Sequence, residues 1–246
     1  MNPSQLLVMD NAQELYVRAA EEIAHFAGEA ICTHGEFTLC LTGGTTPASS
    51  YELLATRFHL SVDWKEVQFF WGDERCVPPD DPASNFGMAN RTMLSKLALR
   101  PEQIHRMRGE DEPLHAAQEY ERELRAFFRL EQPDDFPCFN LMLLGLGENA
   151  HVASLFPRHP ALHEKTRLAV AVEVEAVPSR RISLTMPVIN NAERVMFLVS
   201  GEKKAAAVRN ILRGPADPEQ YPAQFVKPHS GEIIWLMDKA AASELK

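Results

Sequence analysis

Stretches with helical and strand-like spacing of apolar residues alternate along the chain. Between residues 11 and 31, apolar side chains recur every three or four positions, as in a helix with one buried face. Phe37–Leu41 and Val67–Trp71 are short, largely apolar runs, which indicate strands buried on both faces. The alternation of these two patterns predicts an α/β fold with a mostly parallel sheet.

The remaining elements continue this alternation. Further helices are predicted at 48–58, 87–98, 114–130 and 202–213, and further strands at 140–144, 168–174, 181–185, 195–200 and 232–237. Residues 73–86 are polar and interrupted by prolines, which predicts a long loop, and long ordered loops are often functional. No linker rich in Pro, Gly or Ser divides the chain, so we expect residues 1–246 to form one α/β domain.

Composition narrows the classes of function. The chain has 246 residues, of which 45% are hydrophobic, enough to bury a core without stapling. We expect no signal peptide and no spanning helix, because no apolar stretch reaches the roughly 18 residues that a membrane helix needs. The four cysteines form no metal or disulfide motif, which favours reduced thiols in the cytoplasm. The net charge of −9 argues against nucleic acid or an anionic membrane as the partner.

A glycine-rich turn, residues 42–47, joins the predicted strand Phe37–Leu41 to the next helix. Gly43 and Gly44 permit a tight turn and close approach to a ligand, and Thr45 and Thr46 supply hydroxyl groups. Free amides at a helix start suit a phosphate. The segment lacks the lysine and the spacing of a P-loop, so an ordinary turn between strand and helix stays an equal alternative.

Charged side chains follow other predicted strands. Asp73, Glu74 and Arg75 come directly after Val67–Trp71; either carboxylate can transfer a proton, and the guanidinium can bind phosphate. His151 follows a glycine-rich strand end and is a candidate general base, because imidazole titrates near neutral pH. The alternatives are a surface ion pair for the first group and a helix-capping role for the histidine.

Two further groups of cations lie at strand boundaries. Arg181 stands at the start of one predicted strand and Lys204 follows another, where ordinary solvated charge is the alternative interpretation. Ligands of parallel sheets collect at the carboxyl ends of strands, so these cations can share one site. No serine-hydrolase, zinc-protease, calcium-loop or kinase motif is present. Any hydrolysis by this chain therefore uses activated water.

Together and in this order, the segments resemble the 6-phosphogluconolactonase family. The matching stretches are LTGGTTP from residue 41, WGDERCVP from 71 with SN at 84, GLGENAHVASLFP from 145, PSRRISLT from 178 and GEKKA from 201. The resemblance covers nearly the whole chain. The DER loop and the ASLFP ending are its specific parts, whereas the glycine turn alone is not.

The resemblance implies a three-layer Rossmann-like fold, shared with glucosamine-6-phosphate deaminases, ribose-5-phosphate isomerases and CoA transferases. It implies hydrolysis of 6-phospho-D-glucono-1,5-lactone in the oxidative pentose phosphate pathway, without metal or organic cofactor, by a monomer or weak homo-oligomer. His151 would be the base and Asp73 would orient it or the substrate. The residues implied to bind substrate or phosphate are Gly43, Gly44, Thr45, Thr46, Arg75, Asn149, Arg181 and Lys204.

The chain departs from the family pattern beside the histidine. Where the family has Asp-Gly, this sequence has Asn149-Ala150. Asparagine keeps the size and hydrogen-bonding ability of aspartate but not its charge, and alanine is harmful only if its φ is positive. Two alternatives stay open: a sugar-phosphate isomerase or amino-sugar phosphate deaminase that uses Asp73 or Glu74 as base, and a catalytically weakened sugar-phosphate binder.

Overall fold

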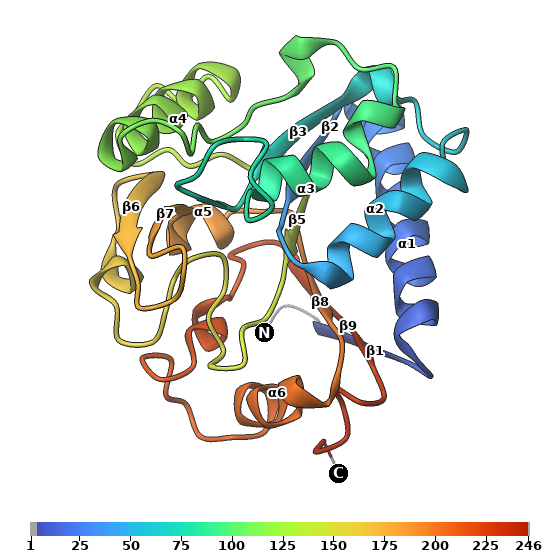
Figure 1. Ribbon diagram of the computed structural model, residues 1–246, viewed down its shortest axis with the longest axis vertical. Coiled ribbons are helices and arrows are strands. Elements are labelled where there is room, and N and C mark those ends of the chain that lie inside the picture. Colours follow the sequence, from blue (N-terminus) through green and yellow to red (C-terminus); the bar gives the residue numbers. More distant parts are fainter. Residues whose placement is uncertain (1–3, 246) are drawn as a thin grey trace.

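Six parallel strands form the central sheet of the computed structural model, which describes residues 4–245 (Figure 1). The strands are β1 (Ser4–Met9), β2 (Phe37–Leu41), β3 (Val67–Trp71), β5 (Leu141–Leu144), β8 (Arg194–Val199) and β9 (Glu232–Asp238). They lie in the order β1-β9-β8-β5-β2-β3, and each neighbouring pair is parallel. The predicted α/β fold with a mostly parallel sheet is confirmed.

Helices cover both faces of this sheet and make it the middle of three layers (Figure 1). One face carries α1 (Ala12–His34), α2 (Thr45–Thr56) and α3 (Asn85–Thr92); the other carries α4 (Pro113–Phe127), α5 (Met186–Ile189) and α6 (Ala205–Leu212). Leu39 and Leu41 of β2 pack with the apolar side chains on the α1 face, and Cys40 packs with those on the α4 face, because side chains alternate along a strand. Within residues 4–245, no helix combines the length and apolar character needed to cross a membrane.

A second, smaller sheet is antiparallel and consists of β4 (Asp73–Arg75), β7 (Arg180–Leu184) and β6 (Ala169–Glu173), in that order. The prediction of a continuous loop over residues 73–86 is wrong at both ends, since it includes β4 and the start of α3. Three polar residues become a strand only because β7 supplies hydrogen-bonding partners, and that contact is invisible in the local sequence.

Other bounds differ from the sequence-based expectations. The expected helix at 48–58 begins earlier, at Thr45, and the one expected at 87–98 ends at Thr92, followed by a 3₁₀ turn at Leu94–Lys96. The helix expected at 202–213 divides into a 3₁₀ turn, Glu202–Lys204, and α6. Neither β1 nor the short α5 was predicted. β1 is an edge strand that pairs only with β9, and its outer residues Leu6 and Val8 are exposed.

A buried carboxylate, Glu74, ties the small sheet to α3. Its two oxygens accept hydrogen bonds from the backbone amides of Arg75 (2.7 Å), Asn85 (2.7 Å) and Phe86 (2.8 Å), and from the Ser84 hydroxyl (3.0 Å). Two of these amides belong to the first turn of α3, where backbone donors lack helical partners. The Glu74 side chain therefore caps the helix and fixes the direction of β4.

We predict that Glu74→Gln lowers the free energy of unfolding by at least about 2 kcal/mol, because the amide group presents hydrogens to donors that need an acceptor. Urea unfolding followed by circular dichroism measures the change. Glu21→Gln, on the exposed side of α1, serves as the control, and we expect its effect to stay within about 0.5 kcal/mol. Equal stability of the two variants would contradict the capping role.

Candidate active site

The candidate site lies at the point where the strand order reverses. From β2 the chain continues to β3 on one side of the sheet, whereas from β5 it continues to β8 on the other. The segments that follow β2 and β5 touch at this point, because the Gly145 amide donates to the Thr42 hydroxyl at 3.4 Å. Such a switch point, outside the carboxyl ends of parallel strands, is the usual ligand site of open α/β sheets.

The turn after β2 is held by a buried tyrosine and by close packing. The Tyr51 hydroxyl donates to the Thr42 carbonyl and accepts from the Thr42 amide, both at 3.0 Å. A Cβ on Gly43 would lie 1.8 Å from Asn85 Oδ1, and Gly44 has a φ of 111°, so both positions require glycine. No side chain caps α2, whose first residue is Thr45, so the first amides of this helix face the site without a side-chain acceptor.

His151 is fixed by its own loop. The Oδ1 atom of Asn149 accepts from the His151 backbone amide at 3.3 Å and lies 2.6 Å from the imidazole Nδ1. Because this oxygen already accepts one N–H, Nδ1 also carries a hydrogen and Nε2 is left with its lone pair. The ring stacks on Phe156, with 4.1 Å between centroids and 11° between planes. A Cβ on Gly147 would lie 2.0 Å from Nδ1, so that residue has to be glycine.

The imidazole is a weak base in the free protein. Burial and, to a smaller extent, the positive charges of Arg181, Lys204 and Arg75 together lower the pKa of His151 to about 4. The ring is therefore neutral at pH 7, with Nε2 ready to accept a proton. Asn149 supplies a hydrogen-bond acceptor on the other nitrogen but no negative charge that would raise the pKa.

Arg75 and Arg181 face each other directly across the antiparallel pair β4 and β7. Arg181 is buried, and its pKa is lowered first by that burial and also by the charge of Arg75. Neither forms an ion pair with a carboxylate in the described chain. Arg75 donates from Nη1 to the Ala83 carbonyl at 2.6 Å, while its Nε is buried without a hydrogen-bond partner among residues 4–245. Like charges opposite one another are unfavourable, so this pair indicates an anion site.

Lys204 reaches the same region from the strand β8. The 3₁₀ turn Glu202–Lys204 begins after Gly201, whose amide donates to the buried carboxylate of Asp238 at 3.1 Å. Burial lowers the pKa of Lys204, and the nearby charge of Glu148 opposes that shift. The lysine is half-buried and its charge acts on His151, which places it beside the imidazole.

Asp73 is buried and its carboxylate is already engaged. One oxygen accepts from the Ser154 hydroxyl at 2.7 Å and the other from Asn85 Nδ2 at 3.1 Å. Asp73 makes no hydrogen bond to the imidazole in the described structure, and its charge instead favours the charged form of Arg181. Together with Glu74, which caps α3, it leaves no free carboxylate at this strand end.

The structure thus gathers the residues that the sequence singled out around the carboxyl ends of β2, β3, β5 and β8. Sequence reasoning gave no role to four residues that hold them there: Tyr51, Asn85, Ser154 and Phe156. Asn85, Ser154 and Phe156 stand inside the quoted motifs, so their place in the pattern was the available signal. The described residues contain no group of three or more His, Cys, Asp or Glu side chains placed to hold a metal ion.

Ala150 has a φ of 65°, the left-handed conformation that the sequence left undecided. Its amide donates to the Gly147 carbonyl at 2.9 Å and its carbonyl accepts from Ala223 at 3.1 Å. A left-handed alanine costs about 1–2 kcal/mol relative to its preferred conformation. The loop that carries His151 therefore holds backbone strain next to the candidate base, a common property of functional loops.

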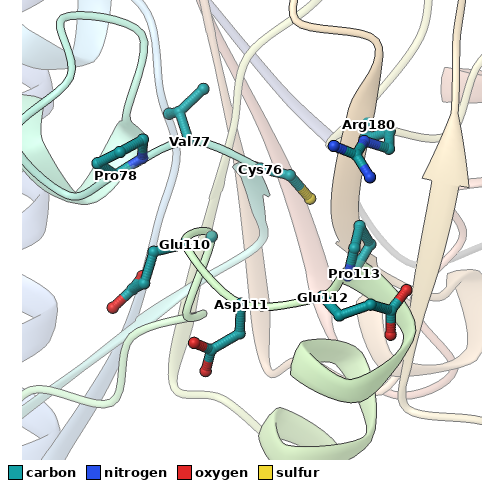
Figure 2. Close-up of a pocket in the computed structure, with 9 residues that line it drawn as sticks. Cys76, Val77, Pro78, Glu110, Asp111, Glu112, Pro113 and Arg180 are labelled. Carbon is teal, nitrogen blue, oxygen red and sulfur yellow. The ribbon is translucent and has the colours of Figure 1, made fainter.

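A hollow of about 350 Å³ lies close to these residues in sequence but on another side of the small sheet (Figure 2). Cys76 and Arg180 line this hollow (Figure 2). Arg180 and Arg181 are consecutive residues of β7, so their side chains lie on opposite faces of the small sheet. The acidic side chains of the hollow are already engaged in ion pairs or as a helix cap: Glu110, Asp111 and Glu112. We therefore locate the candidate site on the opposite face of the small sheet, where Arg75 and Arg181 lie.

The fold is that of an α/β protein with a parallel sheet, and its switch point carries a neutral histidine together with Arg75 and Arg181. The chain belongs to the family of glucosamine-6-phosphate isomerases and 6-phosphogluconolactonases, whose model matches residues 10–235.

Individual relatives agree with this assignment. The chain is 41% identical over 243 residues to a 6-phosphogluconolactonase from Synechocystis sp., with 98% of both chains covered. It is similar to the solved structure of the 6-phosphogluconolactonase from Trypanosoma brucei, with a TM-score of 0.89, 26% identity and all of both chains covered. A monomeric glucosamine-6-phosphate deaminase shares the fold, with a TM-score of 0.81, 22% identity, and 98% and 99% of the two chains covered.

We predict that Asn149→Asp raises the pKa of His151 by about 1–3 from its value of about 4, because a carboxylate at Nδ1 favours the imidazolium. An NMR titration of the histidine Cε1 protons, assigned with His151→Gln, measures the shift. Asn90→Asp on α3 is the control, and we expect no change there. An unchanged titration in Asn149→Asp would show that residue 149 does not contact the ring in solution.

Proposed function

We propose that the chain hydrolyses 6-phospho-D-glucono-1,5-lactone to 6-phospho-D-gluconate. One observation carries the proposal: within residues 4–245, Arg75 and Arg181 have no carboxylate partner, and their charges act on a neutral imidazole whose Nε2 forms no hydrogen bond. An anion holder next to a base suits a phosphorylated substrate that water attacks. The similarity to named 6-phosphogluconolactonases supports this choice of substrate.

The substrate's phosphate binds among the cations in this proposal. Arg75, Arg181 and Lys204 contribute positive charge, and the first amides of α2, at Thr45 and Thr46, donate hydrogen bonds. A hydrogen bond to a charged group contributes about 1.5–3 kcal/mol, so three cations offset the repulsion expected from a net charge of −9. Asp73 orients Arg181 by its charge in place of acting as a base.

The reaction needs one base and returns its proton. Water adds to the lactone carbonyl carbon while one of its protons passes to Nε2 of His151. The nearby cations favour the negative charge that develops on the carbonyl oxygen. The intermediate then breaks the bond between this carbon and the ring oxygen, which takes the proton from the imidazolium and becomes a hydroxyl. The product acid ionises and releases one proton to solvent.

The competing interpretations predict different products. An isomerase or deaminase requires a free carboxylate near C2 of the sugar, whereas Asp73 and Glu74 are buried and engaged with other donors. A catalytically weakened binder would bind 6-phosphogluconate without accelerating lactone opening. As a lactonase the chain would act in the cytoplasm, in the oxidative pentose phosphate pathway, as a monomer or weak homo-oligomer; these three points remain predictions.

We predict that His151→Gln lowers the rate of lactone hydrolysis about 10²–10⁴-fold, because the base is lost while the anion holder remains. The measurement is a coupled assay with freshly generated 6-phosphogluconolactone, corrected for its spontaneous opening. His115→Gln, an exposed histidine on α4, is the control and should retain full activity. Unchanged turnover in His151→Gln eliminates the base role, and ammonia release from glucosamine 6-phosphate would favour a deaminase.

We predict that Lys204→Met raises the KM for the phosphorylated lactone by about 10- to 100-fold, the equivalent of one lost charge-assisted hydrogen bond. Lys203→Met is a matched control, because that lysine lies in the same 3₁₀ turn but is exposed. Steady-state kinetics of both variants give the comparison. Equal KM values for the two variants would remove Lys204 from the phosphate site.

A further inference from the structure

The base of this site is surrounded by charges of one sign. Arg75 on β4, Arg181 on β7 and Lys204 after β8 all act on His151, and each disfavours its protonation. The carboxylate of Asp73, which lies near them, accepts hydrogen bonds from Ser154 and Asn85 and none from the imidazole. Within residues 4–245, no carboxylate forms a hydrogen bond with the imidazole, and the charges that act on it are all positive.

The groups packed directly against the ring are uncharged. Its Nδ1 donates to the neutral amide of Asn149 and its face lies on Phe156. The Arg181 guanidinium lies 5.7 Å from the centroid of that same phenyl ring. Glu148 is exposed and its charge acts on Lys204. An anion bound between the arginines and the lysine is consequently the nearest negative charge that the imidazole can acquire.

We propose that the phosphate of the substrate activates the base as well as anchoring the ligand: a dianion among Arg75, Arg181 and Lys204 raises the proton affinity of His151. This inference rests on the proposed function and deepens it. A negative charge nearby favours the imidazolium. By reciprocity, protonation of the ring raises the affinity of the site for the anion. The free protein thus holds a weak base, and the substrate brings its proton affinity closer to the working pH, where general bases act best.

The coupling makes the phosphate a determinant of turnover in addition to affinity. A lactone without the phosphate meets the weak base of the free site, so it loses kcat as well as binding. An inorganic dianion added separately restores the missing charge. The pH profile of kcat reports the pKa of the base in the substrate complex, and that of kcat/KM reports its pKa in the free protein. We therefore expect kcat to fall off at a higher pH than kcat/KM on the acid side.

An NMR titration of His151 with and without saturating sulfate tests the charge effect directly, since sulfate stays a dianion over the whole pH range. We expect saturating sulfate to raise the pKa of His151 by at least one unit from its value of about 4. Saturating 6-phosphogluconate should raise it by the same amount. Chloride at matched ionic strength is the control. Lys204→Met should show a smaller shift, whereas Lys203→Met should behave as the unchanged protein. If the pKa of His151 is the same without an anion, with sulfate and with 6-phosphogluconate, the proposal is overturned.

Kinetics with D-glucono-1,5-lactone supply the second measurement. We expect saturating sulfate to raise kcat for this unphosphorylated lactone at least tenfold in the unchanged protein and not in His151→Gln. Suppose that the protein hydrolyses the phosphorylated lactone, but sulfate changes neither the titration of His151 nor the turnover of the unphosphorylated lactone. This result refutes the coupling and leaves the proposed function intact. Failure to hydrolyse either lactone refutes the proposed function, while the titration still decides whether an anion and the imidazole are coupled.

Discussion

The antiparallel pairing of β4 with β7 imposes the constraint on which the rest of the site depends. It sets Arg75 opposite Arg181 in a place where neither finds a carboxylate partner within the described chain. Two guanidinium groups in that position repel each other, and the fold tolerates them because Glu74 anchors β4 on α3 and Asp73 lies close to Arg181. In the proposed function a bound anion relieves the remaining repulsion, so the electrostatic cost of the pair and its preference for an anionic ligand have the same origin.

The same charges determine the state of the base. A carboxylate in place of Asn149 would raise the pKa of the ring toward neutral pH, so a larger fraction of the imidazole would be protonated before a phosphate binds. Here Asn149 fixes the tautomer without adding charge, and burial together with the nearby cations keeps the ring neutral. Binding of the anion and protonation of the ring therefore favour each other. A single electrostatic balance connects recognition of the phosphate with activation of water.

The sequence predicts the central sheet well because helical spacing and buried strands are local patterns. β2 and β3 have the predicted bounds, since both are apolar runs buried on two faces. β4 was missed because its three residues are polar and become a strand only beside β7, more than a hundred positions later. β1 was missed although residues 6–9 are apolar, because this short run becomes a strand only beside β9, more than two hundred positions later.

For the site, the sequence singled out candidate residues but not the hydrogen bonds that hold them. His151, Arg75 and Lys204 meet because parallel strands bring their carboxyl ends to one edge, a rule that needs no coordinates. The contacts of Asp73 with Ser154 and Asn85 join residues 81 and 12 positions apart, so no local pattern reveals them. The roles in binding and catalysis stay predictions until the variants are measured.

The two departures beside the histidine act on different properties of the loop. Ala150 keeps the backbone path that glycine would take, at a cost of about 1–2 kcal/mol, because hydrogen bonds to Gly147 and Ala223 fix that path. Asn149 keeps the contact with the ring but removes a charge. The position of the imidazole is thus preserved while its proton affinity falls. In the proposed mechanism, a site altered in this way depends more strongly on the charge of its ligand, because the phosphate supplies the negative charge that Asn149 does not.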